Sequence, residues 1–459
     1  MDAYKPILQS LKSTDIEEFI GISRYISSTR GIGGIIKSKP EDFMIWEVLS
    51  TGEDSRMVFE SDLFSKSGYG EELLCVMKKV KLDSIRAVSI LARTLKIKSE
   101  EIGLCGIKDK MSISWQYVTI PANALNHLRV LRINELIEVK PFRFSPHKLS
   151  SRSLWKNVFQ ITIRNPSNNS IQLIDETLRE LRARGVPNYY GHQRFGITRP
   201  INPIVGKLIM EGRLEEAVSA FLSDYSNLEN KDNREVRRML KETWDLRWAL
   251  DSMPRSLVYE LKMIESLLRE PRDYVKCLRT LPLRLRRLII ESVASKIFNK
   301  ALSKIIDEGR FDELEVGDIV LPIDANGRFR RRRPIIVTNR NIKQVERMVK
   351  DKKMVIALPV PGYLSPIPKS SKGEKLLEAM KEEDVDFEDF KVKHLPEVSS
   401  KGSLRPISIP FWSFSIKSVD EQSITIELSL PPSSYATIFL REIMKPENPL
   451  TYIGRLSAD

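Results

Sequence analysis

Asp109 is the side chain whose neighbours best suit chemistry in this sequence. It follows Gly106 and Lys108 and precedes Lys110, so one carboxylate stands between two ammonium groups. A glycine allows close approach of the backbone to a ligand, and nearby cations favour the ionised form of an acid. This pattern fits a catalytic or phosphate-contacting carboxylate. A solvated turn with Asp and Lys at its tip has the same composition, so these residues alone leave both interpretations open.

The flanking segments place Asp109 on a connection between two regular elements. Residues 82–96 are predicted to form a helix, because one of their faces collects the apolar side chains Ile85, Val88, Ala92 and Leu95. Residues 115–120 predict a strand. The carboxylate is therefore expected in a loop rather than among the groups that fill the interior.

Residues 106–116 read Gly-Ile-Lys-Asp-Lys-Met-Ser-Ile-Ser-Trp-Gln, and this segment resembles the catalytic motif of the TruD family of pseudouridine synthases. Other segments resemble further motifs of that family in the same order, at 36–43, 157–159, 186–196, 434–437 and 440–442. One of them, Asn-Tyr-Tyr-Gly-His-Gln-Arg-Phe-Gly, is long enough to be specific by itself. The ordered matches span most of the chain, which makes the resemblance more informative than any single motif.

The resemblance implies isomerisation of uridine to pseudouridine without a cofactor or a metal. The N1–C1′ bond breaks, the detached base turns, and C5 joins C1′, with no redox step. By resemblance, Asp109 is the carboxylate that attacks C1′ or removes the C2′ proton, and Lys37 is the cation paired with it. Phe159 and Tyr435 are implied to stack on the target base, with Asn157 as a hydrogen-bonding neighbour. Taken alone, Phe159 on an alternating strand also fits a core residue.

Clusters of basic side chains predict contacts to RNA phosphates, although exposed arginines on an edge strand would look the same. The strongest cluster spans 328–333, and a second lies at 284–287. The residues expected to bind RNA are Lys108, Arg194, Arg330, Arg331, Arg332 and Arg333. The family resemblance makes residues 188–196 a structural, RNA-facing turn near the active site. We expect His192 in this turn to be hydrogen-bonded or exposed rather than a metal ligand.

The chain departs from the usual family pattern at a few positions. Ser112 and Ser114 stand where Ala and Thr are usual, and both replacements are close in size. Lys156 replaces the Gly before Asn157 and adds charge beside the strand that is expected to bind substrate. Ala294 replaces a Gln in the stretch that ends at 299.

Strand-like and helix-like segments interleave without a strict parallel pattern, which predicts an α+β fold with a mixed or antiparallel sheet. After residue 196 helical periodicity dominates to about 307, with helices expected at 239–250 and 257–268. Strand-like pieces return between 314 and 358, an acidic run at 378–389 predicts a solvated face, and 399–405 predicts a linker. The resemblance explains this change as a largely helical α+β accessory domain inserted into a pseudouridine-synthase-like catalytic domain. We place the catalytic domain at 1–197 and 399–459, and the insert at 198–398.

Composition fits a protein that binds a polyanion, but on charge alone a generally basic proteome or solubility explains it equally well. The 459 residues carry a formal net charge of +13 with 29% charged and 41% hydrophobic residues, and such an excess of cations neutralises phosphates. The three cysteines, Cys75, Cys105 and Cys277, match no metal-ligand spacing and are expected to be buried in a reducing compartment. No segment predicts a membrane span or a signal peptide. We expect a cytoplasmic monomer that binds RNA and neither DNA nor membranes.

These observations favour a tRNA pseudouridine synthase of the long, archaeal type. By family resemblance, the candidate targets are a uridine of the D-arm region or the middle anticodon uridine of tyrosine tRNA. A non-catalytic RNA-binding or chaperone-like protein is the main alternative, but such a protein has no use for the carboxylate of Asp109. An RNA methyltransferase is less consistent with the sequence, which lacks a glycine-rich strand-to-helix fingerprint for its cofactor.

Overall fold

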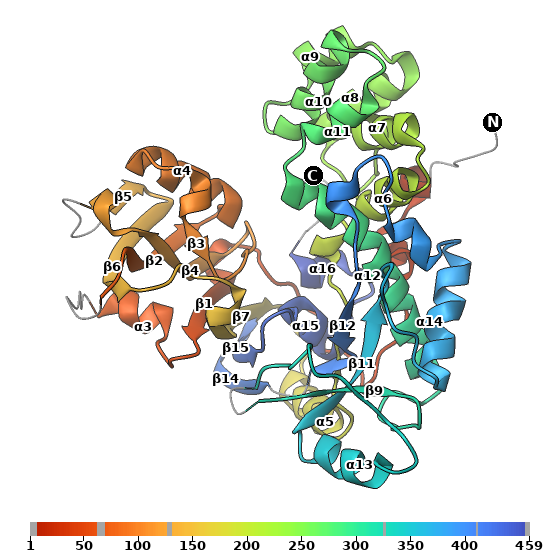
Figure 1. The fold of residues 1–459 in the computed structure, drawn as a ribbon. Helices are drawn as coiled ribbons and strands as arrows, with labels where there is room; N and C mark the ends of the chain where they lie inside the picture. Colours follow the sequence, from red (N-terminus) through yellow and green to blue (C-terminus); the bar gives the residue numbers. More distant parts are fainter. Residues whose placement is uncertain (1–6, 62–68, 126–130, 325–326, 410–411, 455–459) are drawn as a thin grey trace.

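The described strands form one large mixed sheet, a four-stranded sheet and a two-stranded sheet (Figure 1). The computed structural model describes residues 7–61, 69–125, 131–324, 327–409 and 412–454. The large sheet has the strand order β14-β15-β7-β1-β4-β2-β6-β5, with β3 paired to β4. Its strands are β1 (Phe43–Leu49), β2 (Glu72–Val80), β3 (Gly103–Leu104), β4 (Ile113–Pro121), β5 (Leu131–Asn134), β6 (Ile137–Ser145), β7 (Leu154–Arg164), β14 (Ser413–Val419) and β15 (Ser423–Leu430).

The sheet is mixed because β1 and β4 run parallel, with Met44 opposite Ile113. The other pairings of this sheet among the described strands are antiparallel. Parallel neighbours need a crossover connection, and here α3 (Ser55–Glu60), β2 and α4 (Ser84–Leu95) supply it. The predicted α+β class with a mixed sheet is confirmed.

Asp109 lies on the connection between β3 and β4, and α4 precedes this connection as the periodicity predicted. The side chain of Asp83 accepts a hydrogen bond from the backbone N–H of Arg86 and caps the helix. Lys96 ends it in the left-handed conformation, with φ of 57°. The strand predicted at 115–120 is confirmed as part of β4.

The residues after 196 form helices and a four-stranded sheet of order β10-β9-β11-β12. The helices are α6 (Asn202–Met210), α7 (Leu214–Ser223), α8 (Lys231–Thr243), α9 (Leu246–Ser252), α10 (Val258–Arg269), α11 (Tyr274–Arg279), α12 (Leu283–Asp307), α13 (Ile342–Lys350) and α14 (Ser371–Glu382). The strands are β9 (Ile319–Pro322), β10 (Ile335–Ile336), β11 (Met354–Val360) and β12 (Ser403–Pro406). Figure 1 shows α7–α11 gathered at the top, with α12 running from them toward β11 and β12.

Two sequence-based expectations for this region are wrong. The helix expected at 239–250 is broken, because Trp244 is left-handed with φ of 50° and Asp245 caps a new helix. The linker expected at 399–405 contains β12, which pairs with β11. The acidic run at 378–389 is mostly exposed, as expected, although Glu383 pairs with Lys296 and Lys300 of α12.

The remaining elements join the two ends of the chain to the large sheet. The helix α5 (Ser170–Arg184) ends at Gly185, whose backbone N–H donates to the carbonyl of Leu181. These elements are α1 (Ile7–Ser10), α2 (Ile16–Phe19), α5 (Ser170–Arg184), α15 (Ala436–Met444), α16 (Leu450–Ile453) and a two-stranded sheet of β8 (Val186–Pro187) and β13 (Ser408–Ile409).

All three cysteines are free and buried, as expected. Burial raises the pKa of the Cys105 thiol far above its ordinary value, which makes a nucleophilic role unfavourable. Within the described ranges, no helix is long and apolar enough to cross a membrane. No cluster of His, Cys, Asp and Glu suited to a metal ion occurs among the same residues.

Candidate active site

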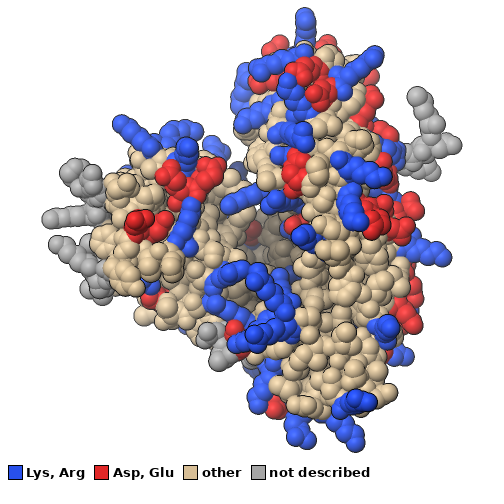
Figure 2. Space-filling model, in the orientation of Figure 1, with Lys and Arg blue, Asp and Glu red and all other residues tan. Residues whose placement is uncertain are grey.

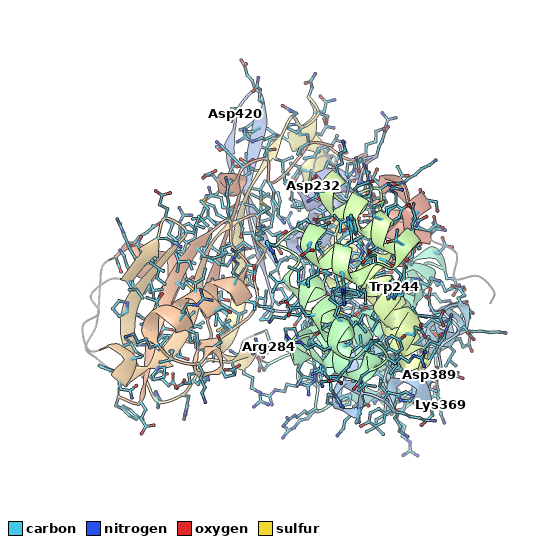
Figure 3. The ribbon with its side chains drawn as sticks, turned by 90° about the horizontal axis from the view of Figure 1, so that it is seen from above. Asp232, Trp244, Arg284, Lys369, Asp389 and Asp420 are labelled. Atoms are coloured by element: carbon cyan, nitrogen blue, oxygen red, sulfur yellow. The ribbon has the colours of Figure 1, made fainter. Side chains whose placement is uncertain are left out.

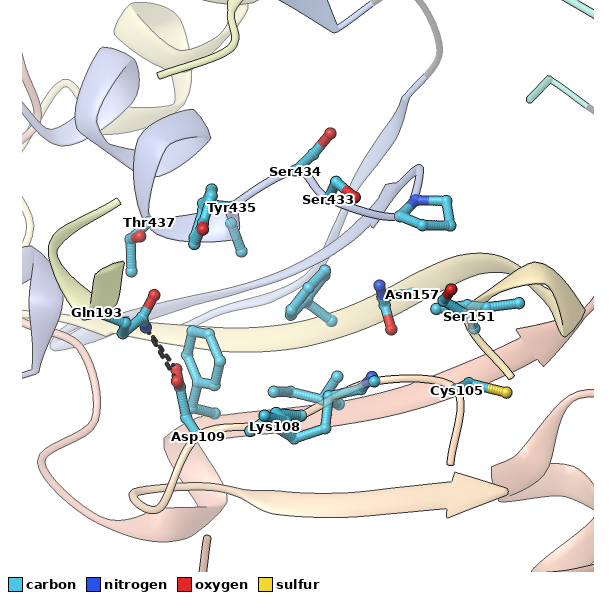
Figure 4. A pocket seen from close by; sticks show the side chains of 18 residues that line it. Cys105, Lys108, Asp109, Ser151, Asn157, Gln193, Ser433, Ser434, Tyr435 and Thr437 are labelled. Atoms are coloured by element: carbon cyan, nitrogen blue, oxygen red, sulfur yellow. Dashed lines mark hydrogen bonds between the residues drawn. The ribbon is translucent and has the colours of Figure 1, made fainter. Parts of the chain in front are cut away.

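A cavity of about 300 Å³ opens beside β1 and β7 and contains Asp109 in its wall (Figure 4). Three parts of the chain that are distant in sequence line it. They are the loop 105–109, the sheet residues Phe43, Ile45, Leu154, Asn157 and Phe159 with Ser151 before β7, and the segment 432–437 together with Gln193. The motifs singled out in the sequence therefore meet at one pocket.

The Asp109 carboxylate accepts hydrogen bonds from two side chains. Lys37 Nζ lies 2.9 Å from Oδ2, and Gln193 Nε2 lies 3.0 Å from Oδ1 and 2.9 Å from Oδ2 (Figure 4). The side chain of Lys37 is 3% exposed, whereas that of Asp109 is 26% exposed and reaches the cavity. This arrangement holds a carboxylate beside a cation and leaves one side of it open to a ligand.

The backbone of Asp109 is also fixed, through its carbonyl oxygen. Lys79 Nζ and Ser112 Oγ each donate to this oxygen at 2.9 Å. Lys79 Nζ also donates to the carbonyl of Leu82 at 2.6 Å. Burial lowers the pKa of Lys79 to about 8, against the opposing effect of Asp109. Neither Lys79 nor Gln193 was predicted as a site residue, although Gln193 stands inside the specific motif at 188–196.

Lys108 lines the cavity but already has a partner inside the protein, so its contact with RNA stays a prediction. Its ammonium group is buried and lies 2.5 Å from Glu47 Oε1, on β1. The other oxygen of Glu47 accepts the backbone N–H of Tyr117 at 2.9 Å. A buried charge needs such a partner, so the Lys108–Glu47 pair ties the loop to the sheet.

The residues expected to hold the base, Asn157, Phe159 and Tyr435, all line the cavity, and Figure 4 shows Tyr435 across it from Asp109. Phe159 is 7% exposed and packs edge-on against Phe43, with ring centroids 6.0 Å apart. Tyr435 is partly exposed and meets Tyr190 edge-on at 6.4 Å. Two buried polar atoms of the lining, Asn157 Oδ1 and Thr437 Oγ1, have no hydrogen-bond partner among the described residues. The pocket thus combines flat apolar surface with unpaired polar groups.

The turn at 188–196 supports Tyr435 through Tyr190. The guanidinium of buried Arg405, from β12, lies 3.9 Å from the centroid of the Tyr190 ring and donates to the carbonyls of Asn188 and Tyr189. Arg194 lies 5.4 Å from the same ring and pairs with Glu291 of α12 at 2.7 Å. Since the Arg194 guanidinium already has this partner, its contact with RNA stays a prediction.

His192 is neither exposed nor hydrogen-bonded, contrary to expectation. It is 1% exposed, neither ring nitrogen has a partner within the described ranges, and its ring meets that of Tyr452 edge-on at 5.6 Å. Burial lowers its pKa to about 4. The motif therefore uses this imidazole as an apolar ring.

Replacing His192 with Phe should remove a pH dependence of stability without cost near pH 7. An unfolded chain binds a proton at its ordinary pKa of about 6.5, so wild-type stability falls as the pH drops from about 6.5 to 4, by about 3 kcal/mol in total. The His192→Phe variant has no such proton to bind. Urea unfolding of both proteins between pH 4.5 and 7.5 measures the difference, and parallel stability curves would contradict this assignment.

The arginine cluster at 330–333 is exposed, and Arg331 lies near Arg405. Figure 2 shows a hollow in the middle of this face with Lys and Arg side chains gathered at its rim. Arg330, Arg332 and Arg333 are exposed. Arg331 is also open to solvent, yet the surrounding protein and the nearby Arg405 lower its pKa.

The second arginine cluster is engaged in part by the protein itself. Arg286 and Arg287 of α12 both donate to Glu397, which weakens their assignment to phosphate. Arg284 is exposed and, in the view from above, lies at the gap between the sheet lobe and the helices (Figure 3).

Comparisons with known proteins agree with the motifs. The family model described as "tRNA pseudouridine synthase D (TruD)" matches residues 19–443. A "Probable tRNA pseudouridine synthase D" from Thermococcus sibiricus is 35% identical over 94% of this chain and 99% of its own length. One from Methanosarcina mazei is 30% identical over 95% and 98%, respectively. A crystal structure of a TruD protein from Methanosarcina mazei superposes with a TM-score of 0.74 at 30% identity, covering 95% of this chain and 99% of the other.

Proposed function

Because this chain belongs to the TruD family of tRNA pseudouridine synthases and is an isomerase that acts on tRNA, we propose that Asp109 carries out the reaction in the cavity beside β1 and β7. The observation that carries this proposal is the carboxylate itself, which faces the cavity between Lys37 and Gln193. Both partners donate hydrogen bonds, so they stabilise the negative charge that a nucleophile or base needs at neutral pH.

The reaction needs only a rearrangement of bonds within one nucleotide. The carboxylate acts at the sugar, on C1′ or on the C2′ proton, while the N1–C1′ bond breaks. After the base turns, C5 bonds to C1′, the hydrogen leaves C5, and N1 takes up a proton. Atoms and electrons balance without any other reactant. Solvent access at Asp109 is limited to the cavity side, which suits a target uridine turned out of its helix.

The detached base needs a surface that holds it while it turns. We assign this role to Phe159 and Tyr435, whose rings line the cavity, since stacking contributes about 1–3 kcal/mol per base and tolerates rotation. Asn157 lines the same space, and its Oδ1 is an acceptor without a partner among the described residues. It suits the N3–H of uracil, a donor that cytosine lacks.

The insert contributes the surface for the rest of the tRNA. We propose that residues 1–197 and 399–459 form the catalytic domain and that 198–398 form the insert. Because β12 pairs with β11 of the insert, we extend the end of the insert from residue 398 to Pro406. The exposed arginines at 330–333 then face the backbone of an RNA whose target nucleotide occupies the cavity. The buried Nε and Nη2 of Arg328 have no partner among the residues that the structure describes, which supports an anion nearby.

Replacing Arg330, Arg331, Arg332 and Arg333 with Ala should weaken tRNA binding and flatten its salt dependence. Each lost phosphate contact lowers the slope of log K against log salt by about 0.7–0.9. Titrations at several salt concentrations measure this slope. As a control, Arg213 and Arg238 are each paired with two glutamates, so replacing them with Ala should leave the slope unchanged. Equal slopes for the cluster variant and wild type would mean that these four arginines do not contact RNA phosphates.

The target uridine is proposed from family resemblance to lie in the D-arm region or in the middle of the anticodon of tyrosine tRNA. Mapping pseudouridine in unmodified tRNA incubated with the purified protein tests this and the activity together. A protein that only binds RNA would retain the tRNA and leave every uridine unchanged, and that outcome would refute the proposed function.

A further inference from the structure

Lys37, the cation beside Asp109, has a strained backbone. Its φ is +58°, in the left-handed region that residues other than glycine rarely adopt. Its ammonium group also lies 4.3 Å from the centroid of the Phe43 ring, so the side chain is held on two sides. Such a conformation persists only where the surrounding structure enforces it. A neighbouring element must therefore hold Lys37 in place.

The C-terminal helix α16 is the element packed against Lys37. The backbone N–H of Ile36 donates to the carbonyl of Thr451 at 3.1 Å, which fixes the chain one residue before Lys37. Gly454 ends α16 with φ of +78° and lies directly over the Lys37 side chain. A Cβ at Gly454 would stand 2.6 Å from Lys37 Cβ and would also overlap its Cγ and Cδ. Atoms so close to the backbone cannot move aside easily, so only glycine leaves room for this rotamer.

The same helix supports the second partner of the carboxylate. The ring of Tyr452 packs on His192, the residue before Gln193, with centroids 5.6 Å apart. Tyr452 is fully buried, and its hydroxyl donates to Glu17, which also accepts from Arg441 of α15. This network anchors α16 between the N-terminal segment and α15. Both groups that hold the Asp109 carboxylate therefore rest on one short helix.

We infer that α16 is a positioning element for the reaction, with Gly454 as its critical residue. The absence of a side chain there lets Lys37 reach Asp109, and Tyr452 supports the turn that carries Gln193. This inference rests on the proposed role of Asp109. It predicts that a single methyl group at 454, outside the cavity lining, changes turnover more than it changes binding or stability.

The test compares Gly454→Ala with Gly309→Ala. Gly309 is matched to Gly454, because it also follows a helix and has φ of +72°, but nothing lies within 4 Å of the position that a methyl group would take there. Both variants carry the same backbone strain, so Gly309→Ala measures the loss of thermal stability that the positive φ causes by itself, and any further loss in Gly454→Ala comes from the overlap with Lys37. Gly454→Ala alone should lower kcat, by about 10- to 100-fold, since a misplacement of about 1 Å can cost a hundredfold. KM for tRNA should stay within about twofold, because no contact with RNA is removed.

Equal kcat values for the two variants would overturn the inference. If Gly454→Ala does not fold, Gly454→Asn against Gly309→Asn gives the same comparison, because Asn tolerates positive φ better and still carries the Cβ. The proposed function fails separately, when Asp109→Asn is as active as wild type. An inactive Asp109→Asn beside a fully active Gly454→Ala would refute the inference alone.

Discussion

Replacing Asp109 with Asn should abolish pseudouridine formation while the protein stays folded. The amide keeps the size and planarity of the carboxylate but cannot act as a nucleophile or a base at the sugar. We expect turnover to fall by about 10⁴-fold, the scale found when one essential carboxylate is removed from an enzyme. A single-turnover assay that follows loss of the C5 hydrogen of uridine as tritium measures this directly.

Stability provides the control for this variant. Lys37 is buried, so loss of its carboxylate partner leaves a desolvated ammonium group and should cost about 1–3 kcal/mol. A double variant, Asp109→Asn with Lys37→Met, removes both charges and should recover much of that stability without recovering turnover. If Asp109→Asn makes pseudouridine at a rate comparable to wild type, the carboxylate is not the catalytic group.

The helix and the strand that flank Asp109 could be predicted from sequence, because the patterns that predict them lie within each element. The apolar face of α4 recurs within twelve residues, and β4 is a continuous run of strand-forming residues. β12 could not be predicted in this way. It has only four residues and includes Pro406, and it is a strand because β11, more than 40 residues earlier in the chain, offers it a free edge. Pairing between distant segments overrides weak local preference.

The residues of the candidate site also differ in whether local sequence could predict them. Asp109 stood out by its neighbours, and Lys37 came from family resemblance, since 72 residues separate the two. The role of Lys79 could have been predicted, because it is a lysine inside the mostly apolar run of β2. A lysine buried there must have partners. The burial of Lys108 and of His192 was not predicted, for the opposite reason. Polar residues near a site look functional in sequence, and only tertiary packing shows that Glu47 and Tyr452 have taken them into the interior.

Truncating Phe159 to Ala should lower both stability and turnover, because this ring belongs to the core and to the cavity. It is 7% exposed and packs on Phe43, so the loss should be about 3–5 kcal/mol, as for other buried aromatics. Phe159→Ala alone cannot show whether the ring stacks on the base. Phe159→Leu can, since it keeps most of the buried volume, at a cost below about 1.5 kcal/mol, and removes the flat face.

If Phe159 stacks on the uracil, Phe159→Leu should lose far more turnover than its small loss of stability explains. Tyr435 gives the complementary test, since it is partly exposed and leaves less of a void on truncation. Tyr435→Phe keeps the ring and should keep most activity, whereas Tyr435→Ala should depress turnover with a modest change in stability. Equilibrium unfolding and single-turnover assays of these variants decide between core and stacking roles. A Phe159→Leu enzyme whose folded fraction is fully active would remove the ring from the mechanism, because a base cannot stack on a branched aliphatic chain as it does on an aromatic face.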